Sequence, residues 1–194
     1  MGAIKKFCLW LTGLINDCYN GCMLRYKKAQ YPADLTIYGR LRIYGGGVIR
    51  IGKGVVINSG ESTNPIGGAD KTIFSLAHGG ELIIGDNVGI SNTAIVCHDQ
   101  VILEEDVRIG GGTKIYDTNF HSLDVEERVG RAEETVKTAP VRIRKGAFVG
   151  AHCIILKGVT IGEQSIVGAG SVVSKSIPDG EVWGGNPARF LRKL

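Results

Sequence analysis

A six-residue apolar repeat in the second half of the chain constrains the fold more than any other feature. From Ile143 to Val173, Ile or Val opens each hexapeptide, and the fifth residue is small, namely Ala147, Cys153, Val159, Ser165 and Ser171. An α-helix repeats every 3.6 residues and a flat strand every two, so neither explains a spacing of six. A hexapeptide forming one strand and one turn does, because about three of them close a triangular coil. The repeat therefore predicts a parallel β-helix.

The repeat is less regular toward the N-terminus. Further lead positions are Ile37, Ile43, Ile49, Ile51, Ile57, Ile84, Ile90, Val96, Leu103, Ile109 and Ile115. From Gly60 to about Gly80 the period is lost, which predicts a loop or an irregular coil. The next lead position after Ile115 is His121, and the charged residues 122–142 then lack the period. We expect a β-helix over 35–178 with a projecting loop at 122–142.

Residues 1–34 have a different pattern. Apolar residues recur at intervals of three and four and are flanked by lysines and arginines: Ile4, Phe7, Leu11, Leu14, Cys18 and Cys22. This spacing predicts one or two amphipathic helices, and the apolar run 7–11 is too short to span a bilayer. We expect this segment to cap the open end of the coil. The alternative is weak peripheral membrane contact through residues 1–30.

Charge and cysteine content narrow the functional classes. The 23 basic and 19 acidic residues are spread along the chain with a net charge of +4, which suits an anionic ligand and indicates no nucleic-acid partner. The five cysteines are odd in number and form no C-x-x-C pair, so we expect free thiols, no structural metal and a cytoplasmic protein. Cys97 and Cys153 lie in the core-facing phase, which favours inert packing over a nucleophilic role.

Two further motifs accompany the ladder, Asp117-Thr-Asn-Phe-His-Ser122 and Gly185-Asn-Pro-Ala-Arg189. With them, residues 35–194 resemble the left-handed β-helix acyltransferases of the hexapeptide-repeat superfamily. The resemblance is greatest to sugar and polysaccharide O-acetyltransferases, such as galactoside, maltose, nodulation and colanic-acid acetyltransferases. It implies acetyl-CoA as co-substrate, a saccharide acceptor, and a homotrimer with active sites between subunits. The left hand also comes from the resemblance, since parallel crossovers are normally right-handed.

The resemblance also implies roles for three residues near the acceptor. His121 matches the general base, and a neutral imidazole can accept the proton of an attacking hydroxyl. Asp117 either orients the His121 ring, as a carboxylate does in a catalytic triad, or only caps a turn. Asn92 matches an asparagine that hydrogen-bonds the acceptor sugar, and it would equally suit a corner that requires positive φ.

The donor would lie along the coil and the C-terminal tail, residues 179–194. The matching positions are Ala151, Ala169, Ser174 and Lys175 for the pantetheine arm, and Arg189 and Arg192 for the nucleotide phosphates. Charge-assisted contact with phosphate explains a basic tail. Relatives often have Ser where this chain has Ala151, so only a backbone contact is expected there.

Other activities occur on the same fold. Amino-sugar N-acyltransferases and antibiotic acetyltransferases remain open, because acceptor choice depends on loops with little motif content. A serine acetyltransferase usually has a large N-terminal helical domain. A carbonic anhydrase needs three converging histidines, whereas His78, His98, His121 and His152 are all more than five residues apart. A non-catalytic scaffold would have no use for His121.

Overall fold

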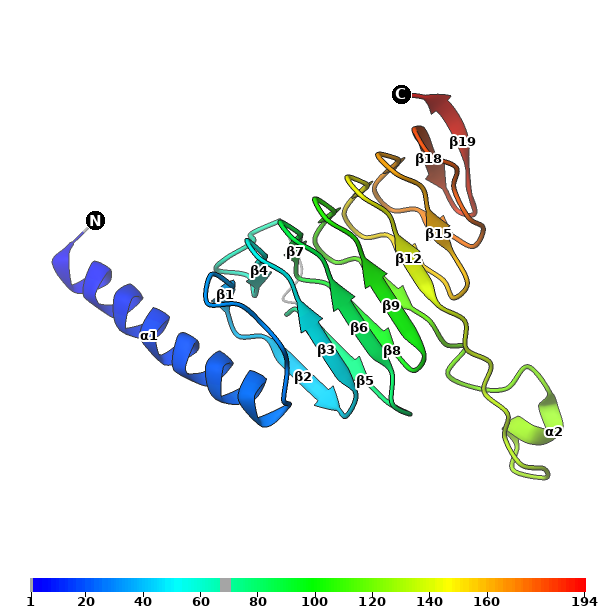
Figure 1. The fold of residues 1–194 in the computed structure, drawn as a ribbon, viewed down its shortest axis with the longest axis horizontal. Helices are drawn as coiled ribbons and strands as arrows, with labels where there is room; N and C mark the ends of the chain where they lie inside the picture. Colours follow the sequence, from blue (N-terminus) through cyan, green and yellow to red (C-terminus); the bar gives the residue numbers. More distant parts are fainter. Residues whose placement is uncertain (1, 67–70) are drawn as a thin grey trace.

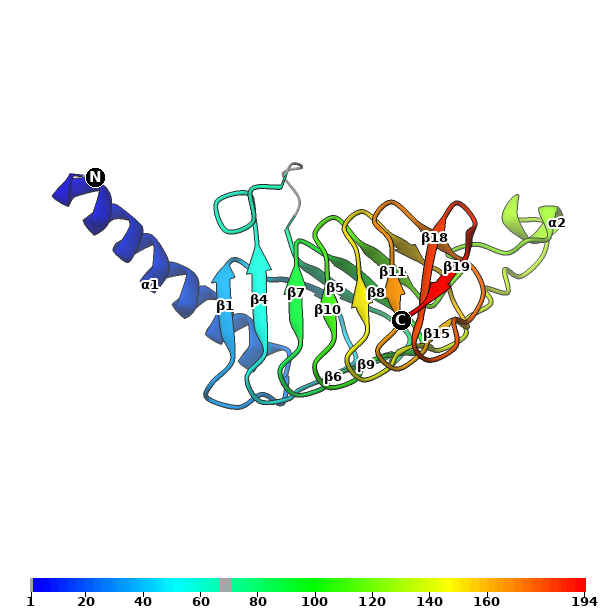
Figure 2. The same ribbon diagram turned by 90° about the horizontal axis from the view of Figure 1, so that it is seen from above.

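The protein forms a three-sided parallel coil with a helix at its N-terminal end (Figures 1 and 2). The structure is a computed structural model that describes residues 2–66 and 71–194. We call the three sheets faces A, B and C. Successive turns of the chain visit B, C and A in that order, so each sheet joins strands that are distant in sequence.

The strands of each face are short and stack in parallel. Face B contains β1 Thr36–Gly39, β4 Val56–Ser59, β7 Gly89–Ser91, β10 Arg108–Ile109, β13 Phe148–Val149, β16 Ile166–Val167 and β18 Glu181–Gly185. Face C contains β2 Arg42–Gly45, β5 Ile73–Leu76, β8 Ala94–Cys97, β11 Lys114–Tyr116, β14 Ile154–Ile155 and β17 Val172–Val173. Face A contains β3 Val48–Ile51, β6 Glu81–Ile84, β9 Gln100–Leu103, β12 Val141–Ile143 and β15 Thr160–Ile161. The last strand, β19 Ala188–Lys193, is antiparallel to β18.

The core is a set of stacked columns inside the coil. Ile109 pairs with Val149, which pairs with Val167 in the next turn, and all three are buried. The small fifth residues of the hexapeptides, Ala147 to Ser171, are buried as well. The predicted parallel β-helix is therefore confirmed. The structure holds together because each turn buries its apolar leads against the next one.

The ladder differs from the prediction at two places. The segment expected to be irregular contains β5, which lies between β2 and β8 with Phe74 fully buried. Val96 is not an inward lead, since Ile95 and Cys97 are the buried residues of β8. Additional residues between β4 and β5 shift the six-residue frame before β5. The spacing of five residues between Ile90 and Ile95 shifts it again at β8, so counting in sixes misses both positions.

The helix α1 Ala3–Tyr26 covers the N-terminal end of the coil with its second half. Leu24 is buried there, and the buried Asn20 side chain donates to Gly39 O at 2.9 Å and accepts from Leu41 N at 3.1 Å. These bonds connect α1 to the chain around β1, which is the edge strand of face B. No helix within the described residues is long and apolar enough to cross a membrane.

One long loop leaves the coil between β11 and β12 and projects from it (Figure 1). Thr118 and Thr138 form an antiparallel bridge at its base, and Ala139 N donates to Asp117 O at 2.9 Å. The loop contains α2 Val125–Arg128, whose first turn is capped by the Asp124 carboxylate. The backbone thus begins its excursion just before His121, and this places the histidine at the root of the loop.

Candidate functional site

The predicted site residues occupy two different edges of face C. The edge between faces B and C, which we call edge BC, carries Asn92, Ala151 and Ala169, because each follows a face B strand and precedes a face C strand. The edge between faces C and A, edge CA, carries Asp117, His121, Ser174 and Lys175. Within this chain, the predicted base therefore lies on a different edge from the predicted corner contacts of the donor, Ala151 and Ala169.

His121 lies in solvent with its side chain 73% exposed. It does not fill the inward position that the six-residue frame assigns to it, because the chain has already left the coil at Thr118. Its Nδ1 is 3.1 Å from Glu134 Oε1. Among residues 2–66 and 71–194, no hydrogen-bond partner of the Nε2 atom is found.

Glu134 is held in place by the loop backbone. Its Oε1 accepts the Ser122 N–H at 2.9 Å and also faces His121. The Ser122 N–H, followed by the histidine, lowers the pKa of the Glu134 carboxyl below its usual range. An ionised carboxylate is only an acceptor, so Nδ1 of a neutral His121 must be the protonated nitrogen. Nε2 then has its lone pair free and can act as a base.

Sequence reasoning missed Glu134. It lies thirteen residues after His121, in a loop with several other acids and no recognisable spacing. Folding alone brings the two together, because the antiparallel base of the loop returns the chain toward His121. In the sequence, the charged character of residues 122–142 was the only indication that a carboxylate of this loop could contact His121.

Asp117 has the turn-capping role of the two that were considered. Its side chain is buried, and its carboxylate accepts the backbone N–H groups of His98 and Asp99 at 2.7–3.0 Å. These donors belong to the preceding turn of the coil on the same edge. Asp117 therefore secures edge CA beneath the loop, while Glu134 is the carboxylate that contacts His121.

Aromatic and imidazole rings form a column along edge CA. The ring centroids of His78 and His98 are 5.1 Å apart. The ring centroid of Phe120 lies 6.4 Å from that of His98 and 5.0 Å from that of Tyr116. Phe120 has a φ of 65°, which non-glycine residues adopt rarely. Phe120 immediately precedes His121, so the column ends next to the histidine in the chain.

Edge BC is built for close backbone approach. A Cβ on Gly150 would lie 2.6 Å from Ala169 N, so only glycine fits beneath that turn. The carbonyl of Ala151 accepts Gly170 N at 2.8 Å, whereas Ala169 is exposed. Asn92 has a φ of 43° and its Oδ1 accepts Gly60 N at 2.8 Å, so it fills the corner role and also secures the loop after β4.

The C-terminal hairpin places its two arginines on one side. Arg189 and Arg192 are three apart in β19, which would normally put them on opposite sides of a strand. A bulge corrects this, since Arg189 pairs with Gly184 and Arg192 with Val182, two positions that share a side of β18. Both arginines are exposed, and no ion pair within the described chain involves them or Lys175.

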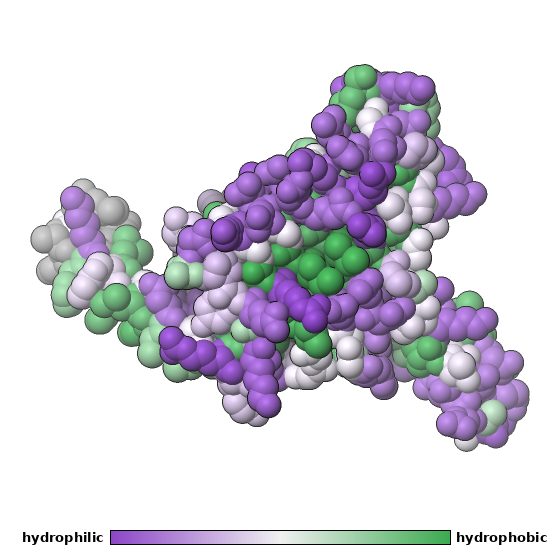
Figure 3. All heavy atoms as spheres, viewed as in Figure 1, coloured by the Kyte–Doolittle hydropathy of each residue, from purple (hydrophilic) through white to green (hydrophobic). Residues whose placement is uncertain are grey.

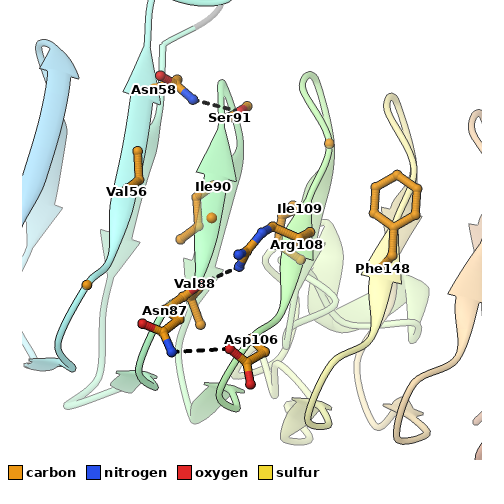
Figure 4. Close-up of a pocket in the computed structure, with 13 residues that line it drawn as sticks. Val56, Asn58, Asn87, Val88, Ile90, Ser91, Asp106, Arg108, Ile109 and Phe148 are labelled. Atoms are coloured by element: carbon orange, nitrogen blue, oxygen red, sulfur yellow. Dashed lines mark hydrogen bonds between the residues drawn. The ribbon is translucent and has the colours of Figure 1, made fainter.

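A wide groove lies away from His121, on the outer side of face B (Figure 4). It has a volume of about 710 Å³ and runs between Val56, Arg108 and Phe148. Gly89 opens it, because a Cβ there would lie 2.9 Å from the Arg108 side chain. It contains no histidine and no pair of acids facing each other, so we do not place the chemistry there.

The remaining reactive groups do not form a second centre. Within residues 2–66 and 71–194, no group of three or more His, Cys, Asp or Glu side chains could hold a metal ion. Cys97 and Cys153 are buried in the core. Burial, and then the nearby Asp117 carboxylate, raise the pKa of the Cys97 thiol to about 12, and burial raises the pKa of Cys153. Neither thiol is a ready nucleophile.

Comparison with known proteins finds similarity to hexapeptide-repeat proteins. Residues 140–175 match the family described as bacterial transferase hexapeptide (six repeats). The "Putative acetyltransferase YJL218W" of Saccharomyces cerevisiae is 34% identical over 122 residues, a match that covers 62% of this chain and 60% of the yeast protein. Gamma carbonic anhydrase 1, mitochondrial, of Arabidopsis thaliana is 37% identical over 101 residues, covering 45% of this chain and 37% of that protein. The chain thus spans less than two thirds of the length of these relatives.

Two solved structures extend the comparison. The hexapeptide-repeat acetyltransferase VCA0836 of Vibrio cholerae, complexed with acetyl coenzyme A, has a TM-score of 0.55 at 34% identity and covers 62% of this chain and 64% of its own. A mutant of AntD, an N-acyltransferase from Bacillus cereus bound to dTDP and coenzyme A, has a TM-score of 0.66 at 26% identity and covers 85% and 83%. The chain therefore carries the hexapeptide repeat over residues 140–175 and has the left-handed parallel β-helix fold of the structures that it resembles.

Proposed function

We propose that this protein is an acetyl-CoA-dependent O-acetyltransferase that acetylates a hydroxyl of a saccharide or polysaccharide precursor. The observation that carries the proposal is the His121–Glu134 pair at the root of the projecting loop. Nδ1 faces an anchored carboxylate, and Nε2 is free and exposed. The names of the relatives supply the reaction class, and the pair supplies the base that this class needs.

The proposed reaction transfers one acyl group and one proton. Nε2 of His121 takes the proton from the acceptor hydroxyl while the oxygen attacks the thioester carbonyl. The carbon–sulfur bond then breaks, and the imidazolium returns the proton to the departing thiolate of coenzyme A. Glu134 stabilises the transient imidazolium and holds the ring orientation, as carboxylates do beside catalytic histidines. Positioned base catalysis of this kind contributes about 10² to 10⁴-fold.

Acetyl-CoA is proposed to lie along edge BC and the C-terminal hairpin. The Ala151 and Ala169 turns offer backbone groups at a close-packed corner, and Arg189 and Arg192 offer, on one side, two cations that form no ion pair within the part of the chain that the structure describes. Phosphates bind such cations strongly. Because His121 lies on edge CA, a second protomer must bring its edge to complete the site. We therefore also propose a homotrimer with active sites between neighbouring coils.

A second candidate is N-acyl transfer to an amino sugar. The AntD match favours it, since that N-acyltransferase covers more of this chain than the Vibrio acetyltransferase does. An amine attacks as its neutral form and still loses a proton, so the same base would serve both acceptors. The acceptor panel described next separates the two reactions.

The deciding experiment measures thiol release from acetyl-CoA against sugars, glycosides and amino sugars. We expect acceptor-dependent release to fall by about 10² to 10⁴-fold in His121→Ala, while binding of acetyl-CoA, measured by calorimetry, is retained. His78→Asn is the matched control, because His78 is also an exposed histidine on edge CA and Asn tolerates its positive φ. Equal rates for wild type and His121→Ala would rule out the base assignment, and a failure to bind acetyl-CoA would rule out the transferase.

Glu134 is proposed as a positioning residue. Glu134→Gln should lower kcat and leave the KM for acetyl-CoA unchanged. The substitution removes the carboxylate that orients the His121 ring, but it removes no residue proposed to bind acetyl-CoA. Glu134→Asp should restore part of the activity. If both variants behave like wild type, the carboxylate only holds the loop together.

A further inference from the structure

The first helix exposes an apolar stripe and packs a mixed face, with both polar and apolar side chains, against the protein. At about 100° per residue, Phe7, Leu11, Leu14 and Ile15 lie on one side of α1. They are all exposed, with Phe7 at 59% and Ile15 at 50%. The opposite side faces the coil, where Asn16 Oδ1 accepts from Arg40 Nε at 2.8 Å, and Asn20 and Leu24 are buried.

The exposed stripe is not needed for capping, since Met23 and Leu24 in the second half of α1 already pack against the coil. A helix that served only to cover the coil would bury its apolar stripe, because that burial is the main source of helix stability in proteins. Here the first half of α1 extends past the coil, and Figure 3 shows apolar side chains gathered on it (Figures 1 and 3). The stripe therefore remains open to an occupant outside the protomer.

The charged residues near the stripe indicate which kind of partner it can bind. Lys6 lies at one end, and Arg25, Lys27 and Lys28 lie at the other, against a single acid, Asp17, in α1. A second copy of the helix would bring like charges together, whereas an anionic lipid surface would neutralise them. Aromatic rings that favour the membrane interface are present too, since Trp10 is 60% exposed and lies 5.9 Å from Phe7, and Tyr26 is 80% exposed.

We propose that the stripe of Phe7, Trp10, Leu11, Leu14 and Ile15 binds the surface of an anionic lipid bilayer. The helix lies in the interface plane with its apolar side chains among the acyl chains and its basic residues at the headgroups. The coil remains in water, attached through the Asn20 and Leu24 side of α1. This inference is independent of the proposed reaction, because it uses no residue of the candidate site.

The test is flotation of the full-length protein with vesicles of phosphatidylcholine alone or with phosphatidylglycerol added. We expect at least about tenfold more bound protein on the anionic vesicles, and a loss of binding as salt is raised, since salt screens exposed charges. The variant Phe7→Ser/Trp10→Ser/Leu14→Ser should fall to the level seen on neutral vesicles. The matched control Leu123→Ser/Val125→Ser/Val129→Ser, which removes equally exposed apolar residues from the projecting loop, should bind like wild type.

Two further readings make the result decisive. Circular dichroism confirms that each variant remains folded, and a blue shift of Trp10 emission in a Trp183→Phe background reports insertion. Absence of binding to anionic vesicles overturns the proposal. So does binding that survives in the α1 variant, or a sedimentation change showing that the α1 stripe holds protomers together without lipid.

Discussion

The coil and α1 both have periodic apolar residues, yet the two regions use them in opposite ways. Inside the coil, the stacked leads such as Ile143, Ile155 and Ile161 are fully buried. On α1, the residues spaced at three and four face solvent, and the side that carries Asn20 and Leu24 holds the helix to the protein. A periodic pattern thus identifies the kind of element without telling what its apolar face contacts.

The difference has a geometric cause. A β-helix closes on itself, so the inward side of every turn meets the turns above and below it. A helix at the end of the coil has no such closure and can place either side against its neighbour. In this chain, the hydrogen bonds of Asn20 to the first turn decide which side that is.

The largest contrast between the regions is expected in thiol reactivity. Cys8, Cys18 and Cys22 of α1 are exposed, whereas Cys97 and Cys153 are buried. The rise in the pKa of Cys97 from 9.0 to about 12 alone lowers its thiolate fraction at neutral pH by about a thousandfold. A thiol reagent should therefore modify three cysteines rapidly in the native protein and the other two only in denaturant. Rapid modification of all five would show that the coil is not closed.

A pair of isoleucines should separate the two regions in stability. Ile155→Ala removes a fully buried lead that stacks between Ile115 and Val173. We expect a loss of about 2–5 kcal/mol in the free energy of unfolding. Ile15→Ala on the open stripe should change it by about 0.5 kcal/mol or less. Urea unfolding at one fixed protein concentration measures both, and equal losses would mean that the stripe is covered in solution.

The polar contact of α1 should have a smaller effect. Asn20→Ala leaves Gly39 O and Leu41 N without their buried partner, at a cost of about 1–3 kcal/mol. The control Thr12→Ala removes an exposed hydroxyl that bonds only to Cys8 O within the helix. Amide hydrogen exchange along α1 checks this, and unchanged protection in Asn20→Ala would show that another contact anchors the helix.

The smallest expected effect is a local response to pH at the projecting loop. The pKa of Glu134 is lowered in the folded protein, first by the Ser122 N–H and then by His121. A lowered carboxyl pKa means that its contribution is present above the ordinary glutamate range and is lost as pH falls through the folded value. The hydrogen-exchange protection factor of the Ser122 amide should therefore fall as pH drops below the ordinary glutamate range of about 4.3, while the protection factors of the coil strands do not. Glu134→Gln should remove this dependence.

The fold was predictable because the coil repeats a local rule. Each hexapeptide supplies its own apolar lead and small corner residue, and errors arose only where spacing changed, at β5 and at Val96. An insertion before β5 hid a strand whose residues Phe74 and Leu76 are ordinary inward positions. Counting in sixes cannot recover a frame after an insertion of arbitrary length.

The candidate site was predictable only in part. His121 stood out because a histidine interrupts an apolar frame, and its position at the root of a loop follows from the loss of the period. Glu134 did not stand out, because its role depends on how the loop returns to its base. Asp117, the carboxylate closest to His121 in sequence, is instead used by the turn beneath it.

The sequence by itself determined the coil, its parallel stacking and the existence of an N-terminal helical segment, because these depend on spacing between near neighbours. The tertiary structure alone decided which carboxylate meets His121, which side of α1 faces the coil, and that Arg189 and Arg192 share a side. Each of these depends on contacts between distant segments or on a single bulge. Such contacts are set by three-dimensional closure, which leaves no periodic mark in the chain.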